Sequence, residues 1–199
     1  MVFTLALISL ATLLSLAAVH APETRRAVII LALHSAVIGL SEAAYCYVER
    51  GTAELPYAVS SLLVSSMAVP ALLLRTAGAA SLRERVPGWA TAVSLALLCL
   101  YAYVALYPPP ELGKMALHMV SAAIPLLMVA SSRDPVRVLI GINMASSSLH
   151  PLLTEAPALF SFLSSTSMLL ANAVGVLVIS SAYREYGTLI IERWAKWRS

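Results

Sequence analysis

The residues best suited to proton chemistry lie inside an apolar stretch. His34 and Glu42 are eight residues apart within residues 27–48, so on a helix they fall about two turns apart on roughly one face. An ionisable side chain inside a membrane is costly and is by default a functional candidate. One interpretation is a proton-relay pair. The other is structural, with His34 bonded to a neighbouring helix and Glu42 reaching water near Tyr45 and Tyr47.

A second polar set lies near the C-terminus, where two apolar segments form a hairpin. Residues 137–152 contain Asn143 and His150, and residues 158–182 contain Asn172. Lipid offers no hydrogen-bond partners, so these side chains are expected to face protein or trapped water. Each is therefore a candidate buried polar or proton-relay residue.

Other kinds of site lack the residues they need. The serine pairs have no accompanying His/Asp arrangement that would activate a nucleophile. Cys46 and Cys99 lie in apolar stretches without metal or disulfide spacing. The sequence has no CxxC, GxGxxG or P-loop. We therefore expect no catalytic residues, no metal ligands and no cofactor, and an embedded enzyme is the least favoured class.

The composition places these residues in a membrane. Of 199 residues, 60% are hydrophobic and 12% are charged, and the mean hydropathy is +0.85. Soluble domains carry about 25% charged residues. The formal net charge of +3 does not indicate a nucleic-acid surface. The composition therefore predicts an all-α integral membrane bundle.

Apolar runs divide the chain into seven expected membrane-spanning helices within a single domain, residues 1–182. A span needs about 20 apolar residues, and the range is about 17–25. The first run lacks a positively charged start, so we interpret it as a span rather than a cleaved signal peptide. The expected spans are residues 1–20, 27–48, 57–74, 89–107, 115–130, 137–152 and 158–182.

The basic residues predict the orientation of these spans. Of the 13 Lys and Arg residues, only Arg50 and Lys114 fall in the second and fourth connections. The other 11 fall in the first, third and fifth connections and in the tail. Because basic residues accumulate on the cytoplasmic side, this asymmetry predicts an external N-terminus and a cytoplasmic C-terminus.

Two further patterns concern organisation. Residues 183–199 have apolar and Trp residues on one helical face, which predicts an amphipathic helix at the cytoplasmic interface. A frayed tail whose Trp residues mark the headgroup level, or a tail docked on a partner subunit, are the alternatives. Residues 1–75 and 115–182 share an order of apolar helix, acidic Pro-containing break and Ser-rich helix, which predicts a three-helix repeat.

Several local stretches resemble a known family. They are Arg133-Asp-Pro-Val-Arg137, Gly141 to His150, Tyr183-Arg-Glu-Tyr-Gly-Thr-Leu189, His34-Ser35 and Val69-Pro70. In these stretches the chain resembles the component E subunit of hydrogenase-4 and formate hydrogenlyase complexes. Its last three spans are similar to the small three-helix subunit of complex I and of Mrp-type antiporters.

The resemblance implies a non-catalytic membrane-arm subunit of a membrane-bound hydrogenase or complex-I-like oxidoreductase in the cytoplasmic membrane. Its partners would be antiporter-like and heel subunits, and it would support proton or sodium translocation without a cofactor. Ser65, Ser146 and Ser167 stand where the family carries ionisable residues, so a direct proton-carrying role is in doubt at those positions. The alternative hypothesis is an independent small transporter that uses His34 and Glu42.

Overall fold

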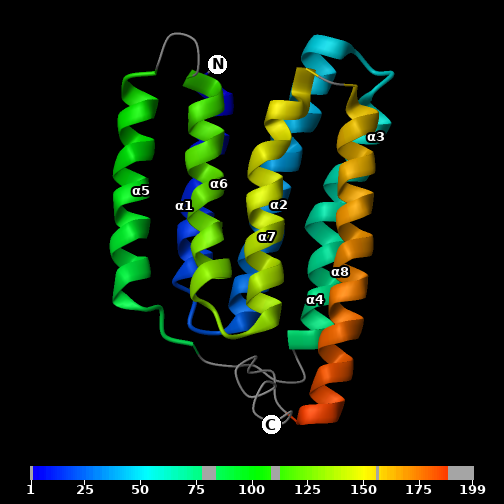
Figure 1. Cartoon of the computed structure of the whole chain (residues 1–199). Coiled ribbons are helices and arrows are strands. Elements are labelled where there is room, and N and C mark those ends of the chain that lie inside the picture. The colour runs from blue at the N-terminus through cyan, green and yellow to red at the C-terminus, as the bar shows by residue number, and fades with distance from the viewer. Residues whose placement is uncertain (1, 78–83, 109–112, 156, 188–199) are drawn as a thin grey trace.

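The chain folds into a bundle of helices that alternate in direction (Figure 1). The computed structural model describes residues 2–77, 84–108, 113–155 and 157–187, and every regular element within those ranges is helical. The elements are α1 (Val2–Val19), α2 (Thr24–Tyr45), η1 (Cys46–Arg50), α3 (Leu55–Leu63), η2 (Val64–Ala68), α4 (Val69–Ala77), α5 (Gly88–Leu106), α6 (Gly113–Ser131), α7 (Pro135–Leu149), η3 (His150–Glu155) and α8 (Ala158–Tyr186). The all-α prediction is confirmed for these residues.

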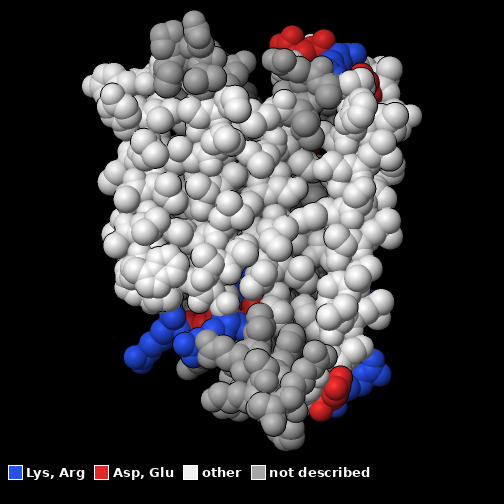
Figure 2. Space-filling view, viewed as in Figure 1, with Lys and Arg blue, Asp and Glu red and all other residues white. Residues whose placement is uncertain are grey.

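Four helical stretches in the described residues are long and apolar enough to cross a membrane. They are Thr24–Arg50, Leu55–Thr76, Gly88–Leu106 and Leu159–Tyr186. Leu5–Val19 and Met115–Ser131 form shorter apolar helices. The chain is therefore a helical membrane protein. On the face shown in Figure 2, charged side chains gather at the two ends and the surface between them is uncharged.

Helix α7 is short and central, and this position explains its polar sequence. Its 15 residues span about 22 Å at 1.5 Å per residue. It packs against α1, α2, α4, α6 and α8. In contrast, α5 and α8 lie at opposite flanks of the bundle (Figure 1) and are the least buried of the long helices. Polar groups on α7 therefore have protein neighbours that α5 could not supply.

Two wide turns interrupt otherwise regular helices. Residues Cys46–Arg50 and Val64–Ala68 are π-helical, and in the second turn the Val69 N–H donates to the Val64 carbonyl. The second turn directly precedes Pro70, which has no N–H to donate. The π turn thus accommodates a proline within this helical stretch.

Local sequence explains two helix ends. The Asp134 carboxylate accepts a 2.9 Å hydrogen bond from the Val136 N–H, and Pro135 occupies the first turn of α7. At the C-terminus, Gly187 adopts a left-handed φ of 65° and its N–H donates to the Tyr183 carbonyl. Residues 183–186 therefore continue α8 rather than beginning a separate tail. The rest of the predicted amphipathic tail, residues 188–199, lies outside the described residues.

Helices α6 and α7 approach each other closely at Gly141. A Cβ placed there would lie 2.8 Å from the Pro125 carbonyl oxygen and 2.9 Å from a methyl group of Val129. Real Cβ atoms do not come so close to backbone atoms, so this crossing requires glycine. Pro125 lies inside α6.

The largest apolar cluster occupies the half of the bundle nearest the α1–α2 turn. Its members come from α1, α2, α4, α6, α7 and α8, so it joins most of the bundle. The fully buried residues include Leu31, Leu73, Ile124, Met128 and Ile140. Polar side chains lie on both sides of this cluster, and they form the two sites described next.

Candidate functional site

Glu42 lies inside the bundle rather than in water at its edge. Its residue is 3% exposed, and its carboxyl group is hydrogen-bonded to the side chain of Ser161 on α8. One turn further along α8, the Ser165 hydroxyl lies 2.7 Å from the Ser61 hydroxyl of α3. Ser161 and Ser165 are four residues apart and therefore share a helical face. This face of α8 contacts α2 and α3 through hydroxyl groups.

The next polar contact along α8 is a reciprocal asparagine pair. The Asn143 amide nitrogen donates to Asn172 Oδ1 at 2.8 Å, and the Asn172 amide nitrogen donates to Asn143 Oδ1 at 2.9 Å. Each amide also donates to the carbonyl four residues earlier in its own helix, at 2.7 Å. All four N–H donors and both side-chain oxygens of the pair are thus hydrogen-bonded within protein. Asn143 is 4% exposed and Asn172 is 1% exposed, so the pair lies within protein.

A small cavity lies between these contacts. Its volume is about 10 Å³, and Val69 and Met168 are its apolar lining residues. The polar lining residues come from α2, η2, α7, η3 and α8, and they are Ser35, Ser65, Asn143, Ser146, Ser147, His150 and Ser165. We call this cavity together with the pairs Glu42–Ser161, Ser61–Ser165 and Asn143–Asn172 the polar seam.

A histidine pair lies on the other side of α7. His34 is fully buried, and its Nε2 atom is 3.3 Å from the Ser148 hydroxyl. His118 on α6 is 5% exposed, and its Nδ1 atom is 3.0 Å from the Ser148 carbonyl oxygen. His34 Nδ1 has no hydrogen-bond partner in the described part of the chain. Ser148 therefore joins two histidines from different helices. The spacing of these three residues in the sequence did not indicate this contact.

The structure brings together some of the predicted residues and separates others. His34 and Glu42 are both buried on α2, but their side-chain partners lie on α7 and α8 respectively. They are therefore attached to different parts of the polar interior rather than to each other. Ser65 and Ser146 meet at the cavity, whereas Ser167 is exposed on the outer surface of α8.

His150 belongs to the seam and not to the surface. It is 7% exposed, lines the cavity, and its Nε2 atom lies 3.3 Å from the Ser164 hydroxyl. Leu149 is the last residue of α7, and a 3₁₀ turn begins at His150 immediately before Pro151. This tighter turn keeps the imidazole beside the start of α8.

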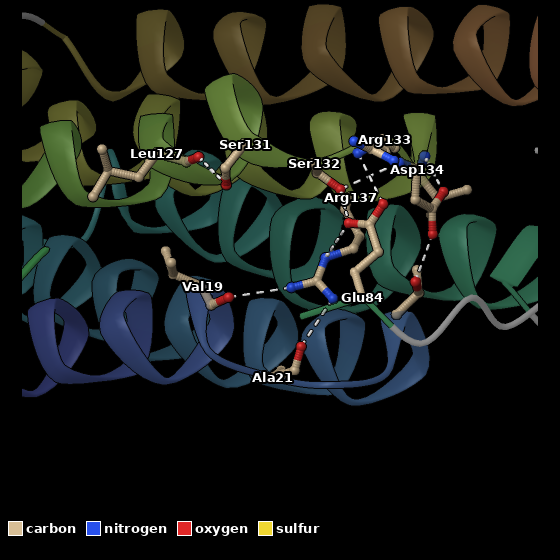
Figure 3. Close-up of polar contacts among 11 residues, drawn as sticks. Val19, Ala21, Glu84, Leu127, Ser131, Ser132, Arg133, Asp134 and Arg137 are labelled. Carbon is tan, nitrogen blue, oxygen red and sulfur yellow. Dashed lines mark hydrogen bonds and ion pairs between the residues drawn. The ribbon is translucent and has the colours of Figure 1, made fainter. Parts of the chain in front are cut away.

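A different polar cluster closes the opposite end of the molecule (Figure 3). The Arg137 side chain is 2% exposed, and its two terminal nitrogens donate to the Ala21 carbonyl at 2.9 Å and the Val19 carbonyl at 3.2 Å. These carbonyls follow the last turn of α1, where helix carbonyls lack intrahelical donors. Arg137 Nε lies 3.7 Å from a Glu84 carboxylate oxygen, which is within ion-pair range but too long for a hydrogen bond.

Glu84 and Asp134 complete this cluster. The Glu84 carboxylate accepts hydrogen bonds from the Ser132 hydroxyl and from the Arg133 N–H, and the Glu84 N–H donates to the Pro22 carbonyl. Asp134 is fully buried and accepts a 2.5 Å hydrogen bond from the Thr24 hydroxyl. We call Thr24, Glu84, Ser132, Asp134 and Arg137 the polar clasp, since it ties the α1–α2 turn, the segment before α5 and the α6–α7 turn together.

Burial also changes the acid–base behaviour of the clasp. Desolvation raises the pKa of Asp134 above its ordinary 3.8, and the hydrogen bonds from Thr24 and the Val136 N–H oppose that shift. A nearby carboxylate, Glu84, raises the pKa further, and Arg137 lowers it. The neutral form of the Asp134 carboxyl group therefore persists to a higher pH than that of a carboxyl group in water.

The place of Arg137 corrects the simplest interpretation of the basic residues. It was counted among the cytoplasmic cations, which are normally solvated, but the structure buries it. Arg26, in comparison, has a side chain that is 64% exposed. The sequence carried a partial signal, because Asp134-Pro135 marks the helix start that places Arg137 in the first turn of α7. Glu84 could not be identified as its partner, because the two residues are 53 positions apart.

No protein-family model, curated protein or solved structure matches this chain.

Proposed function

We propose that this chain is a non-catalytic membrane subunit that supports proton translocation within a larger complex. The observation that carries the proposal is the polar seam, which is a set of hydrogen-bonding groups, mostly hydroxyls and amides, inside a closely packed bundle. Its cavity of about 10 Å³ is at the lower limit for one water molecule and far below the size of a typical solute pocket. A cavity of this size is better suited to proton transfer or to a structural water molecule than to binding a dissolved substrate.

The topology proposed is seven membrane crossings with an external N-terminus and a cytoplasmic C-terminus. The alternation of helix direction (Figure 1) and the exposed basic residues at the clasp end, which include Arg26, Arg133 and Arg184, support it. The membrane is then the cytoplasmic membrane. The short helix α7 crosses within protein, because other helices surround it.

The complex proposed is a membrane-bound hydrogenase or complex-I-like oxidoreductase, as the sequence resemblance implies. The apolar outer faces of α5 and α8 support two partner contacts, since these helices lie at opposite flanks of the bundle (Figure 1). The chain would bridge antiporter-like subunits and the redox module there. The three-helix repeat remains a prediction.

Purification of the tagged chain from its native membrane tests this function. The expected result is co-purification of larger antiporter-like subunits and hydrogenase-like subunits in fixed ratio. A chain that is isolated alone and carries out ion flux alone would contradict the proposal. It would support the second candidate, an independent transporter, which is favoured by the burial of both His34 and Glu42 on one helix. In that case Glu42→Gln should abolish proton flux in liposomes containing only this chain.

A further inference from the structure

Among the residues that the structure describes, three hydroxyl groups at the cavity of the polar seam have no protein partner. Ser35, Ser146 and Ser147 line the cavity, and their side chains make no hydrogen bond within the described part of the chain. Other serines in this region bond to protein groups, as Ser65 does to the Ser61 carbonyl at 2.9 Å. A hydroxyl group that no protein group satisfies is normally hydrogen-bonded to water. Unpaired hydroxyls from two helices that meet at one space therefore indicate a bound polar molecule.

The size of the space identifies that molecule. A cavity needs about 10–15 Å³ to hold one water, and a buried water makes about 2–4 hydrogen bonds. The cavity measures about 10 Å³ and presents three unpaired hydroxyls beside the imidazole of His150. A space of this size and lining matches a single water molecule.

Polar contacts extend from the cavity in two directions, towards Glu42 and towards Asn172. Ser165 lines the cavity and contacts Ser61 at 2.7 Å, one turn of α8 away from the Glu42–Ser161 contact. Asn143 also lines the cavity and is bonded to Asn172. The cavity therefore separates a carboxyl group on one side from an amide pair on the other.

The seam is closed towards the clasp end. Helices α2 and α7 run away from that end, and their residues before the seam are the apolar Leu31 and Ile140 (Figure 1). Helices α4 and α8 run towards it, and their residues after the seam are Leu73 and Ile179. Leu31, Leu73 and Ile140 are fully buried and Ile179 is 5% exposed. Four helices thus contribute to one apolar layer between the seam and the clasp.

We propose that the cavity binds one water molecule, which joins Ser147 and His150 to the Ser61–Ser165 contact. This water extends a hydrogen-bonded path from Glu42 as far as the Asn143–Asn172 pair. Glu42 is the part of the path nearest the α2–α3 loop, and the apolar layer separates the path from the clasp end. Its use in ion translocation rests on the proposed function, whereas the presence of the water does not.

Solid-state NMR of the labelled full chain in lipid bilayers tests the water site, through magnetisation transfer from water to assigned side chains. We expect rapid transfer to the Ser147 Cβ and the His150 ring, and no rapid transfer to the methyl groups of Ile140 and Ile179. A seam that receives water magnetisation as slowly as Ile140 would overturn the inference. This comparison uses the unaltered protein, so it does not depend on a variant that folds.

A cavity-filling variant adds a second measurement. Ser147→Val removes one hydroxyl and fills the space, so we expect loss of the rapid transfer to His150. The matched control is Ser181→Val, at an exposed serine of α8 outside the seam. Retained transfer in Ser147→Val would count against the site. If the variant loses the water but the complex still translocates ions at its normal rate, the water site stands and the proposed function fails.

Discussion

The polar seam and the polar clasp bury polar groups in different ways, and the difference follows from their positions. The clasp contains the ions Arg137 and Glu84 and lies beside turns at one end of the bundle. The seam consists mainly of serine and asparagine side chains and lies among α2, α3, α7 and α8. A charge is most costly near the centre of a bilayer and less costly near its edge. Neutral groups are therefore suited to the interior and ion pairs to the end.

The two regions also differ in how completely their groups are paired. All five clasp side chains are directly hydrogen-bonded, and the Arg137 guanidinium uses two of its three nitrogens. The seam keeps unpaired hydroxyls and a space of water size. A cluster whose side chains all have protein partners resists rearrangement. Hydroxyl groups without a protein partner in the described part of the chain can exchange their hydrogen bonds more easily. The clasp is accordingly suited to a structural role, and the seam is the region on which the proposed function depends.

Replacing the arginine of the clasp should give the largest loss of stability. Arg137→Met leaves the Val19 and Ala21 carbonyls and the Glu84 carboxylate without their partner. Breaking a buried ion pair costs about 3–5 kcal/mol. The measurement is the free energy of unfolding in lipid–detergent micelles. Arg26→Met is the control, because its exposed ion pair with Glu23 contributes below about 1 kcal/mol. Equal losses in both variants would contradict a structural clasp.

A small increase in volume at the α6–α7 crossing should have the next largest effect. Gly141→Ala places a methyl group 2.8 Å from a backbone carbonyl that cannot rotate away. Overpacking of this kind costs about 1–3 kcal/mol. Gly175→Ala is the matched control, since its new methyl group would meet only the flexible end of Leu139 at 3.0 Å. The same unfolding measurement should rank Gly141→Ala as clearly more harmful.

The asparagine pair should show a moderate coupling energy. Asn143→Leu and Asn172→Leu each leave the other amide without its interhelical partner, and the double variant removes both amides. Hydrogen bonds between membrane helices contribute about 0.6 kcal/mol on average and at most about 1.7 kcal/mol. A double-mutant cycle of unfolding free energies should yield a coupling in this range. Asn143→Leu combined with Ser181→Ala should show none, and coupling there would remove the argument for a specific pair.

The pH dependence of Asp134 should be the smallest effect. Its pKa is higher in the folded chain than its ordinary 3.8, so the folded state takes up the proton first as pH falls. The stabilisation from this group is present at low pH and is lost as pH rises through the folded pKa. The stability of the wild-type chain relative to Asp134→Asn should therefore increase on acidification from neutral pH. A difference that is constant with pH would show that burial does not affect this carboxyl group.

Local sequence was sufficient for much of the fold. The predicted spans 27–48, 57–74 and 89–107 correspond to helical stretches at Thr24–Arg50, Leu55–Thr76 and Gly88–Leu106, because hydropathy and helix-ending residues act within one segment. Only part of the candidate site could be predicted from the sequence. Asn143 and Asn172 were identified by their apolar surroundings, but the exposure of Ser167 and the role of Ser148 as a bridge depend on helix rotation, which hydropathy does not encode.

The amino-acid sequence by itself determined that this chain is an apolar helical protein with polar side chains placed where lipid could not satisfy them. Tertiary packing decided which of those side chains became partners. Arg137 meets the end of α1 and Glu84 because three distant turns converge, and Asn143 meets Asn172 because α7 and α8 pack side by side. Hydrogen bonds act over about 3 Å, so contacts between residues far apart in the chain exist only after the helices have assembled.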